Sequence, residues 1–102
     1  MRQFDIYENP ITATRAFAPY VAVLSSHHLP QLDEVVVAPL VNDSSAVVGD
    51  LELAVEINNE RLVLVITDLS SLASQRLRRR VGSLRDREDE IRRALDRLFT
   101  GF

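Results

Sequence analysis

The adjacent histidines His27 and His28 are the side chains best suited to chemistry in this 102-residue sequence. Neighbouring residues of an extended segment point to opposite sides, so the pair is poorly placed to bind one metal ion. The sequence has no third histidine and no cysteine to complete such a site. We therefore interpret the pair as part of an exposed polar loop and expect no metal site.

Other catalytic arrangements find no support in the sequence. Serine, histidine and aspartate all occur, but no elbow motif or spacing groups them as a hydrolytic triad. Gly49, Gly82 and Gly101 are isolated, which argues against a glycine-rich phosphate-binding loop. The acidic run 88–90 lies beside arginines and is most simply a solvated helix face. The residues favour a binding protein with no catalytic group.

The last five residues, 98–102, carry a leucine and two phenylalanines, although chain ends are usually polar and frayed. Two interpretations stay open. Leu98 and Phe102 could complete an apolar helix stripe that packs on a sheet. Alternatively, this end is an apolar anchor for another protein, because buried aromatic side chains dominate interface energetics.

The segments that position these residues are mainly predicted β-strands. Residues 3–8 alternate in polarity, which is typical of a half-buried strand. One face would carry Phe4 and Ile6, and the other Gln3, Asp5 and Tyr7. A second short strand is expected at 20–24. A continuous β-branched run predicts a buried strand at 35–38, where Pro39 implies an edge or a bulge. The expected loops are 25–33 and 42–50, and 10–19 is expected to be a loop or an irregular strand.

The strongest β pattern is a hairpin. Apolar and other residues alternate over 51–57, and 61–67 returns as the second strand. Between them, asparagines in 58–60 can turn the chain because asparagine tolerates left-handed backbone angles. Strands are thus expected within about 3–67.

A helix is predicted over about 84–99. Ser83 and Asp86 fit a helix-start box, and Gly101 is placed to end the helix. Its apolar stripe would consist of Leu84, Ile91, Leu95, Leu98 and Phe102. Two ion pairs at i,i+4 spacing are expected, Glu88–Arg92 and Asp89–Arg93. The segment 72–80 could extend this helix backwards or form a short edge strand.

Composition and charge limit the class of protein. The length and 46% hydrophobic content fit one compact domain over 1–102. Cysteine is absent, the N-terminus does not resemble a signal peptide, and no apolar run could span a bilayer, so we expect a soluble cytoplasmic protein. Residues 1–70 carry a net charge of −7 and residues 71–102 a net charge of +4. Arginines and acids alternate from Asp86 onward, which favours an acidic protein partner or a solvated face over nucleic acid.

From end to end the chain resembles the CcdB family of toxins from bacterial toxin–antitoxin systems. The matching motifs are Phe4-Asp5-Ile6-Tyr7, Val37-Ala38-Pro39-Leu40 and Thr67-Asp68-Leu69-Ser70-Ser71-Leu72. The helix then aligns without a gap at Leu84, Arg87, Glu88, Ile91, Ala94, Phe99 and Gly101. Their order and spacing together carry the resemblance.

This resemblance implies a small SH3-like barrel with a C-terminal helix, a fold shared with MazF and Kid toxins. It implies a cytoplasmic homodimer that is not an enzyme and needs no cofactor. The implied partners are the A subunit of DNA gyrase, whose cleaved-DNA complex the family traps, and a CcdA-like antitoxin. Toxin and antitoxin together would repress their operon, so DNA would be contacted only through the antitoxin.

The implied gyrase-binding residues are Phe99, Thr100, Gly101, Phe102, Asp89, Arg93, Asp96, His27 and His28. Several depart from the family pattern. The family tail ends in tryptophan, glycine and isoleucine where this chain has Thr100, Gly101 and Phe102. His27 and His28 stand where the family has loop isoleucines. Alternatives are therefore a binding module that no longer poisons gyrase, or a MazF-like endoribonuclease.

Overall fold

The computed structural model describes residues 2–26, 33–42, 49 and 51–101. This part of the chain contains mostly strands, with one α-helix at its end. The strands are β1 (Asp5–Glu8), β2 (Tyr20–Val23), β3 (Glu34–Val41), β4 (Glu52–Ile57), β5 (Glu60–Val65), β6 (Ser70–Ala73) and β7 (Arg80–Ser83). The helices are the 3-10 helices η1 (Thr12–Thr14), η2 (Ser74–Arg76) and η3 (Arg85–Arg87), and the α-helix α1 (Glu88–Thr100).

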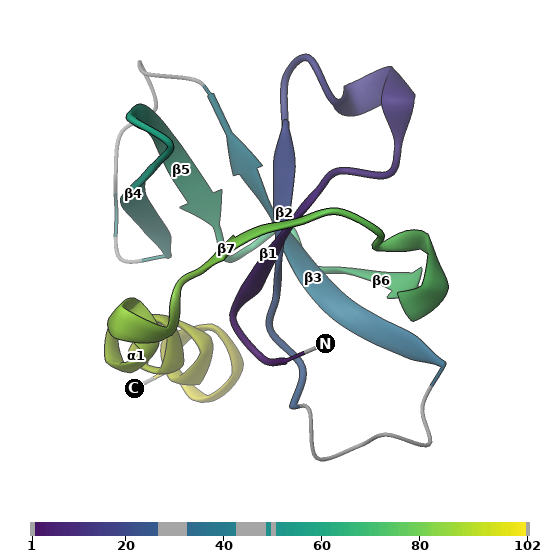
Figure 1. Cartoon of the computed structure of the whole chain (residues 1–102). Coiled ribbons are helices and arrows are strands. Elements are labelled where there is room, and N and C mark those ends of the chain that lie inside the picture. Colours follow the sequence, from purple (N-terminus) through teal and green to yellow (C-terminus); the bar gives the residue numbers. More distant parts are fainter. Residues whose placement is uncertain (1, 27–32, 43–48, 50, 102) are drawn as a thin grey trace.

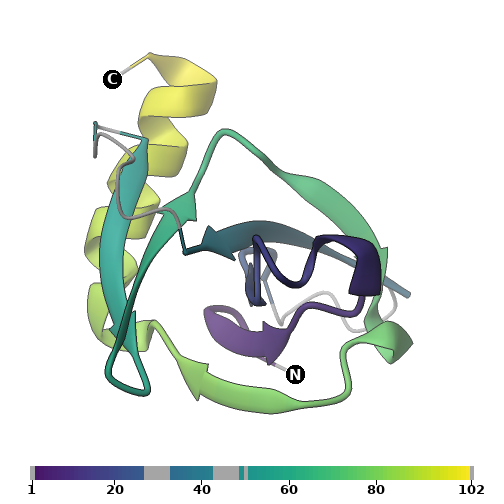
Figure 2. The ribbon, with the colours of Figure 1, turned by 90° about the horizontal axis from the view of Figure 1, so that it is seen from above.

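The strands form one antiparallel sheet in the order β4-β5-β3-β2-β1-β7, with β6 also paired to β3. The sheet curls into a half-barrel, and α1 lies beside β4 and β5 (Figures 1 and 2). The two outer strands face each other across a cavity of about 410 Å³, lined by Val55 and Ile57 of β4 and by Val81 and Gly82 of β7. The predicted mainly β fold with a C-terminal helix is confirmed.

Pro39 lies inside the sheet, so the prediction of an edge or a bulge at this residue is wrong: β3 is an interior strand, and its register with β2 is continuous through Pro39. β3 pairs with β2 on one side, where Pro39 is opposite Val21. On the other side it pairs with β6 through Glu34–Val37 and with β5 from Leu40 onward. Pro39 therefore falls where β3 changes partners, a point at which a missing backbone N–H breaks no ladder on that side.

The prediction that β1 is half-buried is also wrong, because both faces of this strand are covered. Phe4 and Ile6 join the main core, whereas Tyr7 packs into a second apolar cluster with residues of β2, β3 and β6. Burial raises the pKa of the Tyr7 hydroxyl, with the charge of Asp5 adding to the effect. Asp5 is itself buried, and its carboxylate accepts the Arg2 backbone N–H at 3.0 Å and pairs with Arg80 at 3.2 Å.

The predicted hairpin is confirmed as β4 and β5. Ile57 is opposite Glu60, which leaves Asn58 and Asn59 as a two-residue turn. Both asparagines have positive φ, 52° and 66°, as a hairpin turn of type I′ requires. The inward residues of β4 (Leu53, Val55 and Ile57) are buried, while Glu56 is exposed.

Residues 72–80, for which the sequence allowed either a helix extension or an edge strand, do not extend the helix. This segment ends β6, passes through η2 and reaches β7, which pairs only with β1 among the described strands and so forms an edge. The buried side chains of Leu72 and Leu77 cover the outer face of the barrel, in the same cluster as Tyr7. This cover explains why β1 is buried on both sides.

The α-helix begins later than predicted. Ser83 belongs to β7, and its Oγ accepts the backbone N–H of Arg85 at 3.1 Å. Arg85–Arg87 then form η3, and α1 starts only at Glu88. The predicted box between Ser83 and Asp86 is therefore not formed, because Ser83 lies in β7 and its hydroxyl accepts the N–H of the first residue of η3. Gly101 ends the helix as expected, with φ 80°.

Within the described residues, no helix is long and apolar enough to cross a membrane.

Asn59 offers a test of the hairpin turn. We expect Asn59→Gly to keep or slightly raise the free energy of unfolding, because glycine adopts positive φ without steric cost. Asn59→Val should lower it by about 1–2 kcal/mol, since a β-branched residue is strained there. Urea denaturation of the two variants measures the difference. Equal stability would contradict the turn geometry.

Candidate target-binding surface on helix α1

The sequence of α1 fixes which of its faces points inward. Ile91 and Ala94 are fully buried in the main core, and Leu95 and Leu98 pack against the same core while remaining partly exposed. The spacing of three and four residues places all four on one side of the helix. Leu98 therefore completes the apolar stripe, as one of the two open interpretations expected.

The opposite face of α1 is exposed and carries most of the predicted site. Asp89, Arg93, Asp96 and Thr100 follow at intervals of four, three and four residues, so they form one stripe. Phe99 lies at the flank of this stripe in the last turn, with 71% of its surface exposed. The structure thus brings together five of the nine predicted residues, and we call them the α1 outer face.

The last turn of α1 is well formed. The Thr100 hydroxyl donates to the Asp96 carbonyl oxygen, and the Gly101 N–H donates to the Arg97 carbonyl at 3.0 Å. Phe99 is therefore presented from a closed helical turn. His27, His28 and Phe102 lie outside the described residues.

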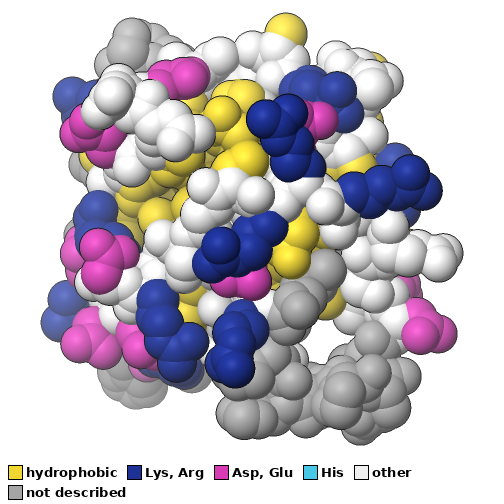
Figure 3. Space-filling model, viewed as in Figure 1, with side chains coloured by type: hydrophobic (Ala, Val, Ile, Leu, Met, Phe, Trp, Pro, Cys, Tyr) yellow, Lys and Arg dark blue, Asp and Glu magenta, His cyan; other side chains and the backbone are white. Residues whose placement is uncertain are grey.

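Ionic contacts divide the polar side chains of α1 into two groups. Glu88 and Arg92 form the predicted pair at 3.1 Å, and the Arg92 guanidinium lies 5.4 Å from the centre of the Phe4 ring. The predicted pair of Asp89 with Arg93 is wrong. Within the described residues, neither these two nor Asp96 forms an ion pair. Their charges are thus available to a partner, and Figure 3 shows the mixed charges over α1 at the lower left.

Arg87 anchors the start of α1 to the barrel. Its guanidinium donates to both carboxylate oxygens of Glu90, at 2.6 and 2.9 Å, and to the Ala54 carbonyl of β4 at 3.1 Å. The hydrogen bonds between Arg87 and Glu90 are the main reason that the pKa of Glu90 is lowered and that of Arg87 is raised. Sequence reasoning missed this anchor, because spacing cannot reveal a contact to a backbone oxygen 33 residues away.

The α1 outer face is suited to binding rather than to chemistry. Its groups are two carboxylates, one guanidinium, one hydroxyl already bonded to the helix, and one exposed aromatic ring. Within the described ranges, no group of three or more histidine, cysteine, aspartate or glutamate side chains could hold a metal ion. A charged stripe beside an exposed ring can supply ionic and apolar contacts to a protein surface.

Known structures share the fold. A structure described as a "Crystal structure of Mtb toxin" is 22% identical, with 78% of this chain and 91% of that chain covered and a TM-score of 0.67. The "Mycobacterium tuberculosis toxin MazF-mt6" is also 22% identical, with 78% and 84% covered and a TM-score of 0.67. An "Endoribonuclease from Mycobacterial species" is 13% identical, with 94% and 88% covered and a TM-score of 0.73. No curated protein sequence matches the chain significantly.

The half-barrel closed by one C-terminal helix defines the fold class of the small MazF-like toxins. Within that class, the family model described as "CcdB protein" matches residues 3–101, and the chain belongs to the CcdB family. It is accordingly a toxin of a toxin–antitoxin system.

The Arg87 anchor generates a prediction on stability. Arg87→Gln should lower the free energy of unfolding by about 1 kcal/mol or more, because the Ala54 carbonyl and Glu90 both lose a charged donor. Glu90→Gln should lower the free energy of unfolding by less, since Glu90 is solvent-exposed. Urea denaturation at neutral pH compares the variants.

The pH dependence has a definite sign. Glu90 has a lowered pKa in the folded chain, so its stabilising effect is present at neutral pH and is lost as pH falls through that pKa. The stability difference between wild type and Glu90→Gln should therefore shrink on acidification. A difference that grows on acidification would contradict the anchor.

Proposed function

We propose that this CcdB-family toxin acts by binding the A subunit of DNA gyrase through the α1 outer face and trapping the cleaved-DNA complex. The observation that carries the proposal is the exposure of Phe99 beside three charges that form no ion pair within the described residues. A ring exposed to this extent is costly to leave in water and gains most from burial in a partner.

Thr100 is the main departure from the family pattern. The tryptophan that the family carries there would add a large ring next to Phe99, and threonine adds little apolar surface. Phe99, together with Phe102, is proposed to supply the apolar contact in its place. The cognate gyrase should then present a pocket suited to phenylalanine, flanked by charges complementary to Asp89 and Arg93.

The remaining assignments follow from family membership. We propose a cytoplasmic homodimer that brings two α1 helices together, a CcdA-like antitoxin that neutralises it, and joint repression of their operon. We also propose that the protein is not an enzyme and uses no cofactor. Sedimentation of the pure chain tests the dimer, and co-expression with the product of the neighbouring gene tests the antitoxin.

Ribonuclease activity is the second candidate, and the likeness to an endoribonuclease structure favours it. That likeness concerns the fold, at 13% identity. Incubation of the pure chain with RNA, without added metal, separates the two candidates. Cleavage would replace gyrase binding as the proposed activity, and intact RNA would remove this candidate.

Phe99→Ala tests the proposed contact. Loss of a buried anchor ring commonly costs about 2 kcal/mol, so binding to a fragment of the cognate gyrase A subunit should weaken about 30-fold. Calorimetric titration measures the affinity. Phe17→Ala is the matched control, because Phe17 is 59% exposed but lies in the connection between β1 and β2. Equal effects of the two substitutions would contradict the proposal.

Thr100→Trp tests the same surface with a substitution that should strengthen binding rather than weaken it. Restoring an indole beside Phe99 should tighten binding and strengthen growth arrest on expression in the host. Weaker toxicity of this variant, with unchanged stability, would count against a gyrase contact at Thr100. No gyrase binding by either the wild type or Thr100→Trp would favour a toxin-derived module with another partner.

A further inference from the structure

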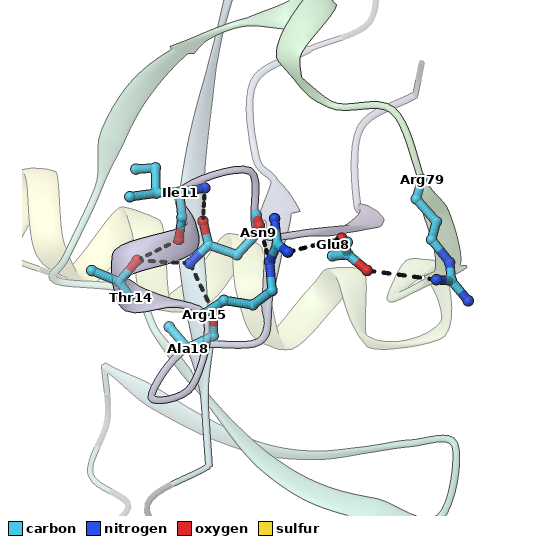
Figure 4. A network of polar contacts seen from close by, with 7 residues as sticks. All are labelled: Glu8, Asn9, Ile11, Thr14, Arg15, Ala18 and Arg79. Carbon is cyan, nitrogen blue, oxygen red and sulfur yellow. Dashed lines mark hydrogen bonds and ion pairs between the residues drawn. The ribbon is translucent and has the colours of Figure 1, made fainter.

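A second charged surface lies away from α1, where η2 and the start of β7 meet the connection between β1 and β2. The side chains of Arg15, Arg76, Arg78 and Arg79 surround a cavity of about 300 Å³, together with Glu8 and Pro10. Figure 4 shows Glu8 between Arg15 and Arg79. We call this cavity and its four arginines the arginine pocket.

The arginine pocket is built on a rigid frame. Asn9 is buried, and its amide group donates to the Thr14 hydroxyl at 3.0 Å and to the Ala18 carbonyl at 2.8 Å (Figure 4). The Arg15 Nε donates to the Asn9 carbonyl at 2.8 Å, and the Glu8 N–H donates to the Arg79 carbonyl at 2.9 Å. Backbone segments about 70 residues apart are thereby fixed side by side, so the backbone that carries the pocket is ordered before a ligand binds.

The pocket carries an excess of positive charge. Glu8 is shared by Arg15 at 3.6 Å and Arg79 at 3.7 Å, so one carboxylate faces four guanidinium groups and leaves a net charge of +3. Within the described residues, neither Arg76 nor Arg78 forms an ion pair, and both are exposed. The next residue, Arg80, is paired with buried Asp5 and is not part of the pocket. Such an excess favours an anionic ligand.

The lining selects among anionic ligands. Guanidinium groups bind phosphate oxygens in two-pronged fashion. The lining has no aromatic ring, so it offers no platform on which single-stranded bases could stack. Pro10 is its only apolar side chain, so an acidic peptide would find almost no apolar subsite for an anchor residue. The lining therefore favours a ligand that presents only phosphates.

We propose that the arginine pocket binds the phosphate backbone of double-stranded DNA, independently of sequence. The site is separate from the α1 outer face and does not depend on gyrase binding. It also departs from the expectation that DNA is contacted only through the antitoxin. In a complex held on an operator, the toxin would add phosphate contacts that position the assembly without reading bases.

Two double variants of equal net charge test the pocket. Arg76→Gln with Arg78→Gln removes two arginines that have no ion pair in the described structure, whereas Arg61→Gln with Arg85→Gln removes two exposed arginines elsewhere. Fluorescence anisotropy of a labelled DNA duplex of about 30 base pairs measures the binding affinity at several salt concentrations. The pocket variant should bind at least about tenfold more weakly at low salt, with a salt slope reduced by about 2, and the control should bind like wild type.

Glu8→Gln should strengthen binding to the DNA duplex. Removing the shared carboxylate frees Arg15 and Arg79, so duplex affinity should rise by about tenfold at low salt. Glu60→Gln changes the net charge equally at an exposed position outside the pocket and should have little effect. If Glu8→Gln raises the duplex affinity and Glu60→Gln does not, the rise cannot be an effect of net charge.

Three outcomes would overturn the proposal. The first is an equal response of the pocket and control variants, which would indicate general charge attraction. The second is binding of a single strand of the same length more tightly than the duplex. The third is binding of poly-glutamate, lost in the pocket variant, without duplex binding, which would assign the pocket to an acidic protein partner. Circular dichroism confirms that each variant is folded.

Discussion

Burial of Ile91 and Ala94 in the main core is the contact on which the proposed activity depends. These two side chains fix the rotation of α1 about its own axis. Once that rotation is set, helical geometry alone places Asp89, Arg93 and Asp96 in solvent. The same constraint leaves Phe99 at the flank of the exposed stripe, because it lies too far around the helix to reach the core.

Contacts between distant parts of the chain hold this arrangement together. Arg87 joins the start of α1 to the Ala54 carbonyl of β4, and Arg92 lies over the Phe4 ring next to β1. On the far side of the half-barrel, Glu8 joins the end of β1 to Arg79. Each of these contacts is made by an arginine head group. Within the described residues, arginines therefore both anchor distant segments and carry positive charge on the surface.

Much of the fold could be predicted from local pattern, and the errors have physical causes. The hairpin, its asparagine turn and the helix stop at Gly101 follow from neighbouring residues alone. The burial of Tyr7 could not be predicted locally, because the side chains packed against it include Leu72 and Leu77, which lie about 70 residues later. Similarly, the change of partners at Pro39 depends on three strands. For the candidate sites, the resemblance to the CcdB family indicated the residues of the α1 outer face, but it could not show that Asp89 and Arg93 form no ion pair within the described residues. Sequence spacing also could not bring Arg15 to the arginines within 76–80, and the sequence alone favoured an acidic protein partner or a solvated face for the basic end of the chain.

The most direct test of the account is a residue-by-residue map of the gyrase interface. Amide chemical shifts of the labelled chain, recorded with and without a fragment of the cognate gyrase A subunit, would give this map. If gyrase binds the α1 outer face, shifts should cluster at Asp89, Arg93, Asp96, Phe99 and Thr100, while the region of Arg76 and Arg78 stays unchanged. Shifts confined to the barrel, with the α1 outer face unaffected, would contradict it.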